Sequence, residues 1–347
     1  MAYTTINKSS EHFNTKLYTG TGSSNAVTGV NFRPDLVWIK NRVRAEDHAM
    51  FDAVRGSSGG YYGKIRSNST AAQEYDGNGM SAIGSDGFTV LDQDQVNRSG
   101  DTYASWNWKA NGAGSANTDG TISSTVSANT TSGFSIVKYT GTGSNATVGH
   151  GLGAAPKMVI VRRISPGGEW YIHAGQLNDN EKVLVLNTTA ANANASTVFN
   201  NTAPTSSVFS LGTNGDANGN TYEHIAYCFA EKTGYSKFGS YTGNGSTDGT
   251  FVYTGFKPAF VIFKRTNSTG NWQLLDNKRL GYNPENRTFY PNSNIAEQNE
   301  DDADLLSNGF KLKSTGGDSN ISGGQYIYMA FAEAPLVGSN NVPCTAR

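Results

Sequence analysis

The feature of this sequence that most constrains its fold is an internal repeat that occurs three times. In each copy, a short run of large apolar residues follows a proline and ends in a basic residue: residues 35–40 after Pro34, 157–163 after Pro156 and 259–265 after Pro258. Continuous apolar runs of this length, with β-branched and aromatic residues, are typical of strands buried on both faces. We therefore expect each run to be the core strand of one structural unit.

Three further landmarks surround each run at nearly constant spacing. A Tyr-Thr-Gly segment precedes it, with its tyrosine 16, 17 and 17 residues before the proline. A phenylalanine after a polar turn and a final aromatic run follow it. The landmarks are Tyr18, Tyr139 and Tyr241, then Phe88, Phe209 and Phe310, then residues 103–108, 225–229 and 327–331. Their common order indicates three tandem copies of one unit of about a hundred residues.

The repeat divides the 347-residue chain into modules. We expect module 1 at residues 1–112, a linker rich in Gly, Ser, Thr and Asn at 113–132, module 2 at 133–232, module 3 at 233–335 and a C-terminal tail at 336–347. Because no linker separates modules 2 and 3, we expect these two to pack closely and module 1 to be free to sit apart.

Each module is expected to be all-β. A polar turn and a second apolar strand follow the core strand, at residues 169–172 in module 2 and 271–275 in module 3, and this order predicts a hairpin. The closing run at 325–331 carries apolar residues on both of its alternating faces, as in a central strand of a two-layer structure. The economical architecture is three tandem copies of a β-sandwich-like module, with a barrel as the second choice.

Composition and charge exclude several classes of function. The formal net charge is −1 at pH 7, which gives no basic footprint for nucleic acid. No apolar run approaches the roughly 18 residues of a membrane-spanning helix, and the first residues lack the apolar core of a signal peptide. The 41 glycines and abundant Asn, Ser and Thr suit a turn-rich protein built to endure outside a cell. We expect neither nucleic-acid binding nor membrane insertion.

No arrangement of residues predicts catalysis. The five histidines lack the spacing of a zinc site, and Cys228 and Cys344 are expected to be unpaired thiols. The acidic run at 300–304 lacks the pattern of an EF-hand loop and is expected to be a solvated loop, while a weak cation site in an Asx-rich loop stays open as an alternative. We expect a protein that is not an enzyme and that holds no metal or cofactor.

Two tryptophans are weak candidates for ligand contacts. Trp170 and Trp272 each lie 14 residues after their proline, where module 1 has His48. We expect both to pack in the core or against the hairpin, because large aromatic side chains dominate core burial. A ligand platform is the alternative.

A recurring acid–base pair is the second weak candidate. Asp52 and Arg55 in module 1 align with Asp276 and Arg279 in module 3, whereas module 2 has Ala and Leu at these positions. We expect a surface pair that stabilises a turn, worth about 0–1 kcal/mol. Half of a binding site is the alternative.

Three segments resemble phrases found in virion proteins of tailed bacteriophages, notably marine ones: residues 117–135 with 139–143, residues 147–153 and residues 234–241. The resemblance covers most of the chain and is to a family usually labelled tail fibre or virion structural protein. It implies a virion address, assembly in the host cytoplasm, contacts with other virion proteins and a homo-oligomer, trimers being common in phage fibres. Three internal copies could instead give one chain pseudo-threefold symmetry.

These observations give three hypotheses of function. The first is a non-enzymatic virion surface protein, a tail fibre or adhesion component that contacts host surface glycan. The second is a capsid decoration or other purely structural virion protein, and the third is a polysaccharide depolymerase that uses Asp52 or Asp276. Because the copies share their core strands, we expect function to lie in the loops where they differ.

Overall fold

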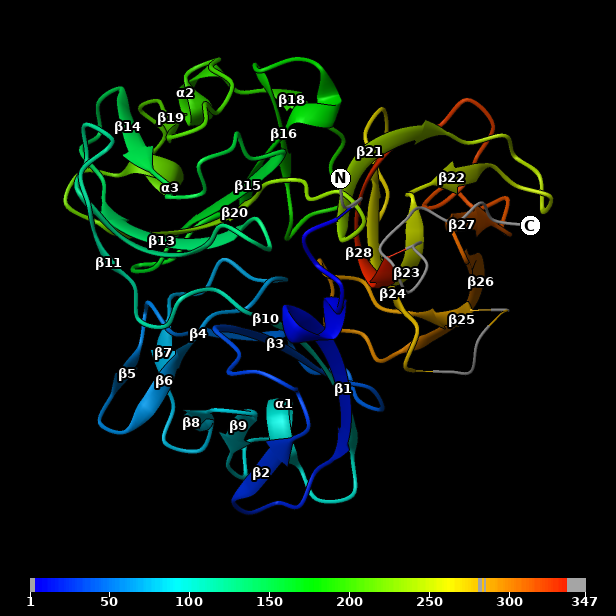
Figure 1. Ribbon diagram of the computed structural model, residues 1–347, viewed down its shortest axis with the longest axis horizontal. Coiled ribbons are helices and arrows are strands. Elements are labelled where there is room, and N and C mark those ends of the chain that lie inside the picture. The colour runs from blue at the N-terminus through cyan, green and yellow to red at the C-terminus, as the bar shows by residue number, and fades with distance from the viewer. Residues whose placement is uncertain (1–3, 280–282, 284, 336–347) are drawn as a thin grey trace.

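The computed structural model describes residues 4–279, 283 and 285–335, and it is built almost entirely of antiparallel β-strands. The chain forms three lobes around a common centre, coloured blue to cyan, green, and yellow to red in Figure 1. Each sheet in the described part of the chain takes its strands from one repeat, and none closes into a barrel. The expected all-β, sandwich-like fold is therefore confirmed. The C-terminal tail at 336–347, with Cys344, lies outside the described residues.

Module 1 contains two sheets stacked as layers and one small sheet. Its elements are η1 Ser9–Glu11, β1 Phe13–Thr19, β2 Asn25–Thr28, β3 Leu36–Asn41, β4 Ala49–Asp52, β5 Ser57–Ser58, β6 Tyr61–Lys64, β7 Glu74–Tyr75, β8 Met80–Gly84, β9 Gly87–Val90, α1 Asp94–Asn97 and β10 Thr102–Trp108. The inner sheet, which faces the centre of the molecule, has the order β1-β10-β3-β4. The outer sheet is β2-β9-β8, and the small sheet is β5-β6-β7.

Module 2 repeats this plan with a larger inner sheet. Its elements are β11 Ser115–Asn117, β12 Ser124–Asn129, β13 Phe134–Thr140, β14 Ala146–Gly149, β15 Met158–Arg163, β16 Tyr171–Ala174, η2 Gly175–Leu177, β17 Lys182–Val185, β18 Ala193–Asn194, α2 Ser196–Phe199, β19 Val208–Leu211, α3 Gly215–Asn218 and β20 Glu223–Phe229. The inner order is β11-β12-β13-β20-β15-β16-β17-β18, and β14-β19 form the outer sheet.

The expected linker at 113–132 is wrong. It contains β11 and β12, and β12 pairs with β13 along the edge of the module 2 sheet. The physical reason is that two apolar residues of this polar stretch, Ile122 and Val126, are buried in the module 2 core. Strand pairing uses backbone hydrogen bonds and needs few apolar side chains, so the polar composition of this stretch did not indicate its strands.

Module 3 has two four-stranded layers. Its elements are β21 Ser236–Thr242, β22 Phe251–Tyr253, β23 Phe256–Arg265, β24 Trp272–Asp276, β25 Glu285–Thr288, β26 Gln298–Leu306, β27 Gly309–Leu312 and β28 Gln325–Pro335. The inner order is β21-β28-β23-β24 and the outer order β22-β27-β26-β25. The acidic run at 300–304, expected to be a solvated loop, lies in β26, where Asp302 and Ala303 are buried.

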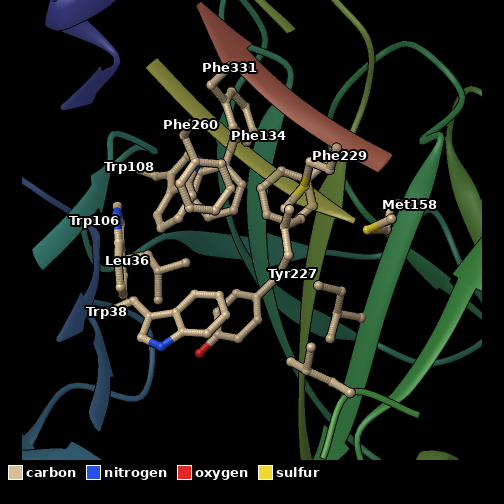
Figure 2. Close-up of a cluster of buried hydrophobic side chains, with 14 of the residues drawn as sticks. Leu36, Trp38, Trp106, Trp108, Phe134, Met158, Tyr227, Phe229, Phe260 and Phe331 are labelled. Atoms are coloured by element: carbon tan, nitrogen blue, oxygen red, sulfur yellow. The ribbon is translucent and has the colours of Figure 1, made fainter. Parts of the chain in front are cut away.

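The core strands are apolar throughout because each separates two cores. In β23, Phe260 and Ile262 face the centre of the molecule, whereas Val261 and Phe263 face the module's own outer sheet. The closing strand β28 alternates in the same way, as its sequence predicted. The central core combines residues of all three inner sheets; Figure 2 labels Leu36, Trp38, Trp106, Trp108, Phe134, Met158, Tyr227, Phe229, Phe260 and Phe331.

Module 1 does not sit apart, contrary to expectation. The Trp108 ring of β10 contacts Phe134 and Phe229 of module 2 with centroid distances of 6.4 and 6.5 Å. It also contacts Phe260 and Phe331 of module 3 at 5.6 and 5.8 Å. All three modules therefore pack at one shared core. The inner face of each module is apolar and has to be covered by the other two.

We expect Trp108→Ala to lower the free energy of unfolding by about 3–5 kcal/mol, because it opens a cavity where the three modules meet. Urea denaturation followed by circular dichroism measures this loss. The control is Tyr75→Ala, which truncates an aromatic side chain that is 46% exposed and should change stability by less than about 0.5 kcal/mol. A loss below about 1 kcal/mol at Trp108 would contradict the central core as the main contact between modules.

Candidate functional site

The Tyr-Thr-Gly segments form loops that close around a buried asparagine in each module. The asparagine side-chain oxygen accepts a hydrogen bond from a backbone N–H of the loop, and its side-chain nitrogen donates to a serine carbonyl there. The pairs are Asn97 with Thr21 and Ser23, Asn218 with Thr142 and Ser144, and Asn320 with Asn244 and Ser246. The motif thus serves the fold, because its polar groups are satisfied within the loop.

Sequence reasoning missed these asparagines, although a signal was present. Each lies six residues before the aromatic ring that stacks on the motif tyrosine. The stacked pairs are Tyr18 with Tyr103, Tyr139 with His224 and Tyr241 with Tyr326, at centroid distances of 5.1, 5.2 and 4.8 Å.

The Asp52–Arg55 pair is buried between modules 1 and 2. The Asp52 carboxylate accepts hydrogen bonds from Arg55 Nε at 2.5 Å and from the Tyr227 hydroxyl of module 2 at 2.8 Å. Asp52 is 1% exposed and Arg55 6%. The expected surface pair is therefore wrong: the turn after β4 points into the molecule, where a neighbouring module covers it.

The Asp276–Arg279 pair plays the same part between modules 3 and 1. Asp276 accepts from Arg279 Nε at 2.6 Å and from the indole nitrogen of Trp106 in module 1 at 3.0 Å. Both side chains are fully buried. Arg279 also lies over the Phe289 ring, 4.5 Å from its centroid.

The interface between modules 2 and 3 lacks this polar contact on both sides. The strand registers place Met329 of β28 where the other modules have Trp106 and Tyr227. Module 2 has Ala174 and Leu177 where the others have the aspartate and arginine. Losing both partners together leaves no unpaired charge, which is the arrangement that a buried site tolerates.

Trp170, Trp272 and His48 lie in the interior, where each ring nitrogen donates to a backbone carbonyl of the preceding module in cyclic order. The contacts are Trp170 to Arg66 at 2.7 Å, Trp272 to Val185 at 3.0 Å and His48 to Tyr290 at 3.1 Å. The structure therefore places both tryptophans as packing residues between modules, out of reach of a ligand in solvent.

The second-to-last residue of each core strand is a cation that is buried at an interface. Lys40, Arg162 and Lys264 are all fully buried and donate to backbone carbonyls, such as that of Thr189 for Lys264. Burial lowers the pKa of Lys40 and of Lys264 to about 8, and that of Arg162 to about 10. Arg162 and Lys264 therefore bond across a module interface, whereas Lys40 bonds within module 1 and lies over the Phe289 ring of module 3, 5.5 Å from its centroid.

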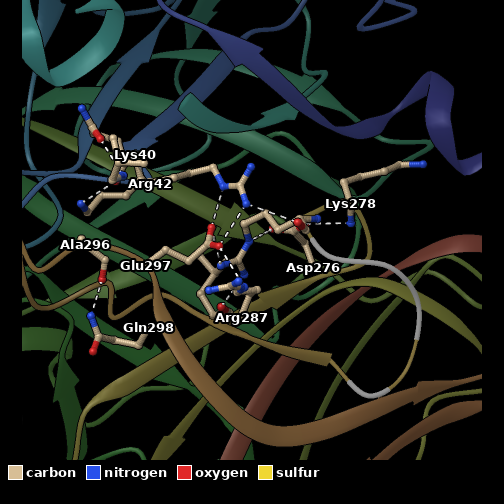
Figure 3. A network of polar contacts seen from close by, with 12 residues as sticks. Lys40, Arg42, Asp276, Lys278, Arg287, Ala296, Glu297 and Gln298 are labelled. Atoms are coloured by element: carbon tan, nitrogen blue, oxygen red, sulfur yellow. Dashed lines mark hydrogen bonds and ion pairs between the residues drawn. The ribbon is translucent and has the colours of Figure 1, made fainter. Parts of the chain in front are cut away.

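Modules 1 and 3 are also joined by a network around Glu297 (Figure 3). Two nitrogens of Arg42 in module 1 donate hydrogen bonds to this carboxylate, at 2.6 and 3.0 Å. Arg279 and Arg287 form longer ion pairs with it, at 3.8 and 3.6 Å. The Glu297 side chain is 5% exposed. Such a two-point Arg–carboxylate contact fixes orientation as well as distance.

The two Asp–Arg pairs and the two tryptophans thus stabilise the contacts between modules and are not accessible to a ligand in solvent. A surface that can bind a ligand lies on the outside of the molecule. Two exposed aromatic residues lie on one strand of module 3: Phe251 is 44% and Tyr253 60% exposed. Both are in β22, an edge strand of the outer sheet, where alternate residues share a face while Val252 points into the core.

Charged side chains and an open backbone adjoin this aromatic pair. Phe251 is paired with Lys311 and Tyr253 with Gly309 in the neighbouring strand β27. A Cβ atom at Gly309 would lie 3.1 Å from Phe251 Cε2, so the phenylalanine ring lies against bare backbone. Lys311 forms an ion pair with Asp248. We name Phe251, Tyr253, Gly309, Lys311 and Asp248 the aromatic platform.

The aromatic platform occurs in module 3 alone among the three described copies. Val27, Val148 and Val252 occupy equivalent positions, because each pairs with the phenylalanine landmark of its own repeat: Phe88, Phe209 and Phe310. Module 1 therefore has Ala26 and Thr28, and module 2 has Thr147 and Gly149, in place of the two aromatic residues.

Within residues 4–279, 283 and 285–335, no three or more His, Cys, Asp or Glu side chains are grouped so that they could hold a metal ion. No helix in that part of the chain is long and apolar enough to span a membrane. Cys228 is a buried free thiol whose pKa is raised by burial.

A family model, described as a domain of unknown function (DUF7483), matches residues 8–335. The chain belongs to this family. No curated protein and no solved structure matches it. The matched span covers all three modules, so the DUF7483 unit is the whole three-module body and not one repeat.

In the DUF7483 chain, we expect Asp52→Ala to lower the free energy of unfolding by about 3–5 kcal/mol, because it leaves the Arg55 guanidinium buried without a counter-charge. Tyr227→Phe should cost only about 1.5 kcal/mol, because Asp52 keeps its bond to Arg55. Urea denaturation measures both.

The matched control is Glu11→Ala, which breaks the exposed Lys8–Glu11 pair at the same three-residue spacing and should cost less than about 0.5 kcal/mol. If Asp52→Ala costs no more than this control, Asp52 and Arg55 act as a surface pair after all.

His48 provides a test of pH dependence. Burial, with Lys40 and Arg279 nearby, lowers its pKa well below the usual range. The unfolded chain therefore binds a proton on His48 below about pH 6.5 that the folded protein does not bind. Through this group, stability falls as the pH decreases, by up to about 1.4 kcal/mol per pH unit.

We expect the stability of the wild type relative to His48→Gln to fall as the pH goes from about 7 to about 5, because the variant lacks this titrating group. Chemical denaturation of both proteins over this range measures the difference. A difference that is independent of pH would show that His48 titrates equally in the folded and unfolded chains.

Proposed function

We propose that this protein is a non-enzymatic surface protein of a tailed-bacteriophage virion, a tail fibre or other adhesion component whose third module contacts a host surface glycan. The virion address is supported by the resemblance of residues 117–135, 147–153 and 234–241 to phage virion proteins. The glycan contact is supported by the aromatic platform on β22 and β27.

The aromatic platform is the observation that carries the proposal. Sugar rings present an apolar face of C–H groups and an edge of hydroxyl groups, and an exposed aromatic ring fits the first because its face is electron-rich. Phe251 and Tyr253 offer two such rings on one strand, and Lys311 and Asp248 offer charged groups for the hydroxyls beside them. A ligand site usually combines apolar surface with a small number of precisely placed polar groups.

The three-module body suits a protein that holds a surface in place. The central core and the polar contacts between modules fix the three outer sheets relative to one another. A rigid body loses little conformational freedom on binding, which favours affinity at a small contact area. Several such bodies in one virion would add avidity.

The depolymerase hypothesis loses its candidate residues. Asp52 and Asp276 are buried and each is hydrogen bonded to an arginine and to an aromatic side chain of another module. A polysaccharide cannot reach either carboxylate in this fold. We therefore propose no depolymerase activity for these residues.

We expect the purified protein to bind at least one glycan on an array of bacterial surface polysaccharides. The double variant Phe251→Ala and Tyr253→Thr should lose at least tenfold in affinity, because it replaces both rings by the side chains that module 1 has at these positions. The control is Tyr75→Ala, an exposed tyrosine of module 1, which should bind as the wild type does.

Binding that is unchanged in the double variant would refute the aromatic platform. An array with no bound glycan, together with a capsid-lattice position in cryo-EM reconstructions of the virion, would favour the alternative of a capsid decoration or other purely structural virion protein. A distal tail position is expected for the adhesion component.

A further inference from the structure

Two carboxyl groups lie close together between the two layers of module 3. Asp302 and Glu300 are separated by one residue on β26 of the outer sheet. Both line a cleft of about 440 Å³ together with Gln273 of the inner sheet. Asp302 is 3% exposed, and in its protonated form it is a hydrogen-bond partner of Glu300. We name Asp302 and Glu300 the carboxyl pair.

The hydrogen-bond partners of Asp302 come from three other elements, and all are neutral. The Thr288 hydroxyl of β25 donates to its carboxyl group at 2.8 Å, and the Ser319 hydroxyl in the loop before β28 also binds it. In the orientation that satisfies its amide, Gln273 of β24 donates to both carboxyl oxygens, at 2.7 and 3.2 Å. Asp302 therefore joins the outer sheet to the inner sheet. A buried charge is tolerated when an opposite charge pairs with it, and neutral donors do not supply one.

Among the residues that the structure describes, no Lys or Arg forms an ion pair with the carboxyl pair. Lys313 donates its backbone N–H to the Asp302 carbonyl at 2.8 Å, but its side chain pairs with Asp304 at 3.6 Å. Arg287 of β25 pairs with Glu297 at 3.6 Å. The ionisable groups around Asp302 are acidic or phenolic: Glu300 and Asp301 on β26, Asp318 in the loop before β28, Tyr290 after β25 and Tyr241 on β21.

This environment favours a proton on Asp302 in the folded protein. Burial, and after it the charge of Glu300, raise the pKa of Asp302 to about 7, although the Thr288 hydroxyl acts in the opposite direction. In the unfolded chain an aspartate has a pKa of about 4. Between these two values the folded protein binds a proton that the unfolded chain does not bind. Through this group, stability falls as the pH rises across that window and is level above it.

We propose that the carboxyl pair is a proton-dependent switch that controls how firmly the outer sheet of module 3 is held against the inner sheet. With its proton, Asp302 donates a hydrogen bond to Glu300 and the two layers are held together. Without the proton, two carboxylates face each other with no counter-charge, so β25 and β26 are held less firmly. The inference does not depend on the aromatic platform or on a virion location.

The test compares the whole wild-type protein with Asp302→Asn by chemical denaturation at about pH 5, 6, 7 and 8. The asparagine amide has the same shape and can donate to Glu300, but it cannot ionise. We expect the folding equilibrium constant of the wild type, relative to the variant, to fall by up to about tenfold per pH unit from pH 5 to 7 and then to level off. The ratio removes the contribution of His48, which has the opposite sign and is common to both proteins.

Hydrogen exchange tests whether the effect is local to the outer sheet. After correction for the intrinsic exchange rates, amides of β25 and β26 should exchange faster in the wild type than in Asp302→Asn at about pH 8, and equally at about pH 5. The matched control is Asp304→Asn on the same strand, whose carboxylate is paired with Lys313 and is 20% exposed. Its stability relative to the wild type should be constant between about pH 5 and 8.

A stability ratio between the wild type and Asp302→Asn that is independent of pH would overturn the inference. Equal exchange of β25 and β26 in the two proteins at about pH 8 would overturn it as well. Should Asp302→Asn fail to fold, Glu300→Gln decides, because it keeps an acceptor for the Tyr290 hydroxyl and removes the charge beside Asp302. The fall in stability should then move to lower pH than in the wild type, and an unchanged pH profile would contradict the switch.

Discussion

The burial of each core strand between two apolar cores is the constraint on which the rest of the structure depends. A sandwich that used only its inner and outer sheets would leave Leu36, Met158 and Phe260 exposed on the far side of the inner sheet. These residues instead meet at the centre, where Trp108 touches rings of the other two modules. The modules are therefore not independent domains, because each needs the other two to cover its inner face.

The polar contacts follow from this arrangement. Once three apolar faces meet, the backbone and the charged ends of the strands are buried as well, and each needs a partner. The solution recurs in cyclic order: a ring nitrogen of one module donates to a backbone carbonyl of the preceding module, as Trp170 does to Arg66. A cation closes each core strand against backbone carbonyls, as Lys264 does with Thr189. This explains why the basic residue after each apolar run is retained while the residues before it vary.

The sequence predicted the elements of the fold well and the contacts between modules poorly. The apolar runs, their prolines and the alternation in 325–331 identify the strands, because burial on two faces leaves a local pattern. The burial of Asp52 and Arg55 leaves no such pattern, since it depends on Tyr227, which is far away in the chain. The strands β11 and β12 escaped notice because pairing at an edge requires backbone groups more than apolar side chains. Which aromatic residues are exposed, Phe251 and Tyr253 among them, follows only from the assembled layers.

We expect function at positions where one module differs from the other two. A residue that holds the modules together can differ between copies and still make the same contact, as His48 does where modules 2 and 3 have Trp170 and Trp272. One departure lies on the surface: Phe251 and Tyr253 of β22 are exposed where modules 1 and 2 have smaller side chains. Module 3 therefore carries a surface that the other two modules lack, although all three share one core. A scaffold held by its centre can change at such positions without losing its fold, because the changed side chains carry little of the contact between modules.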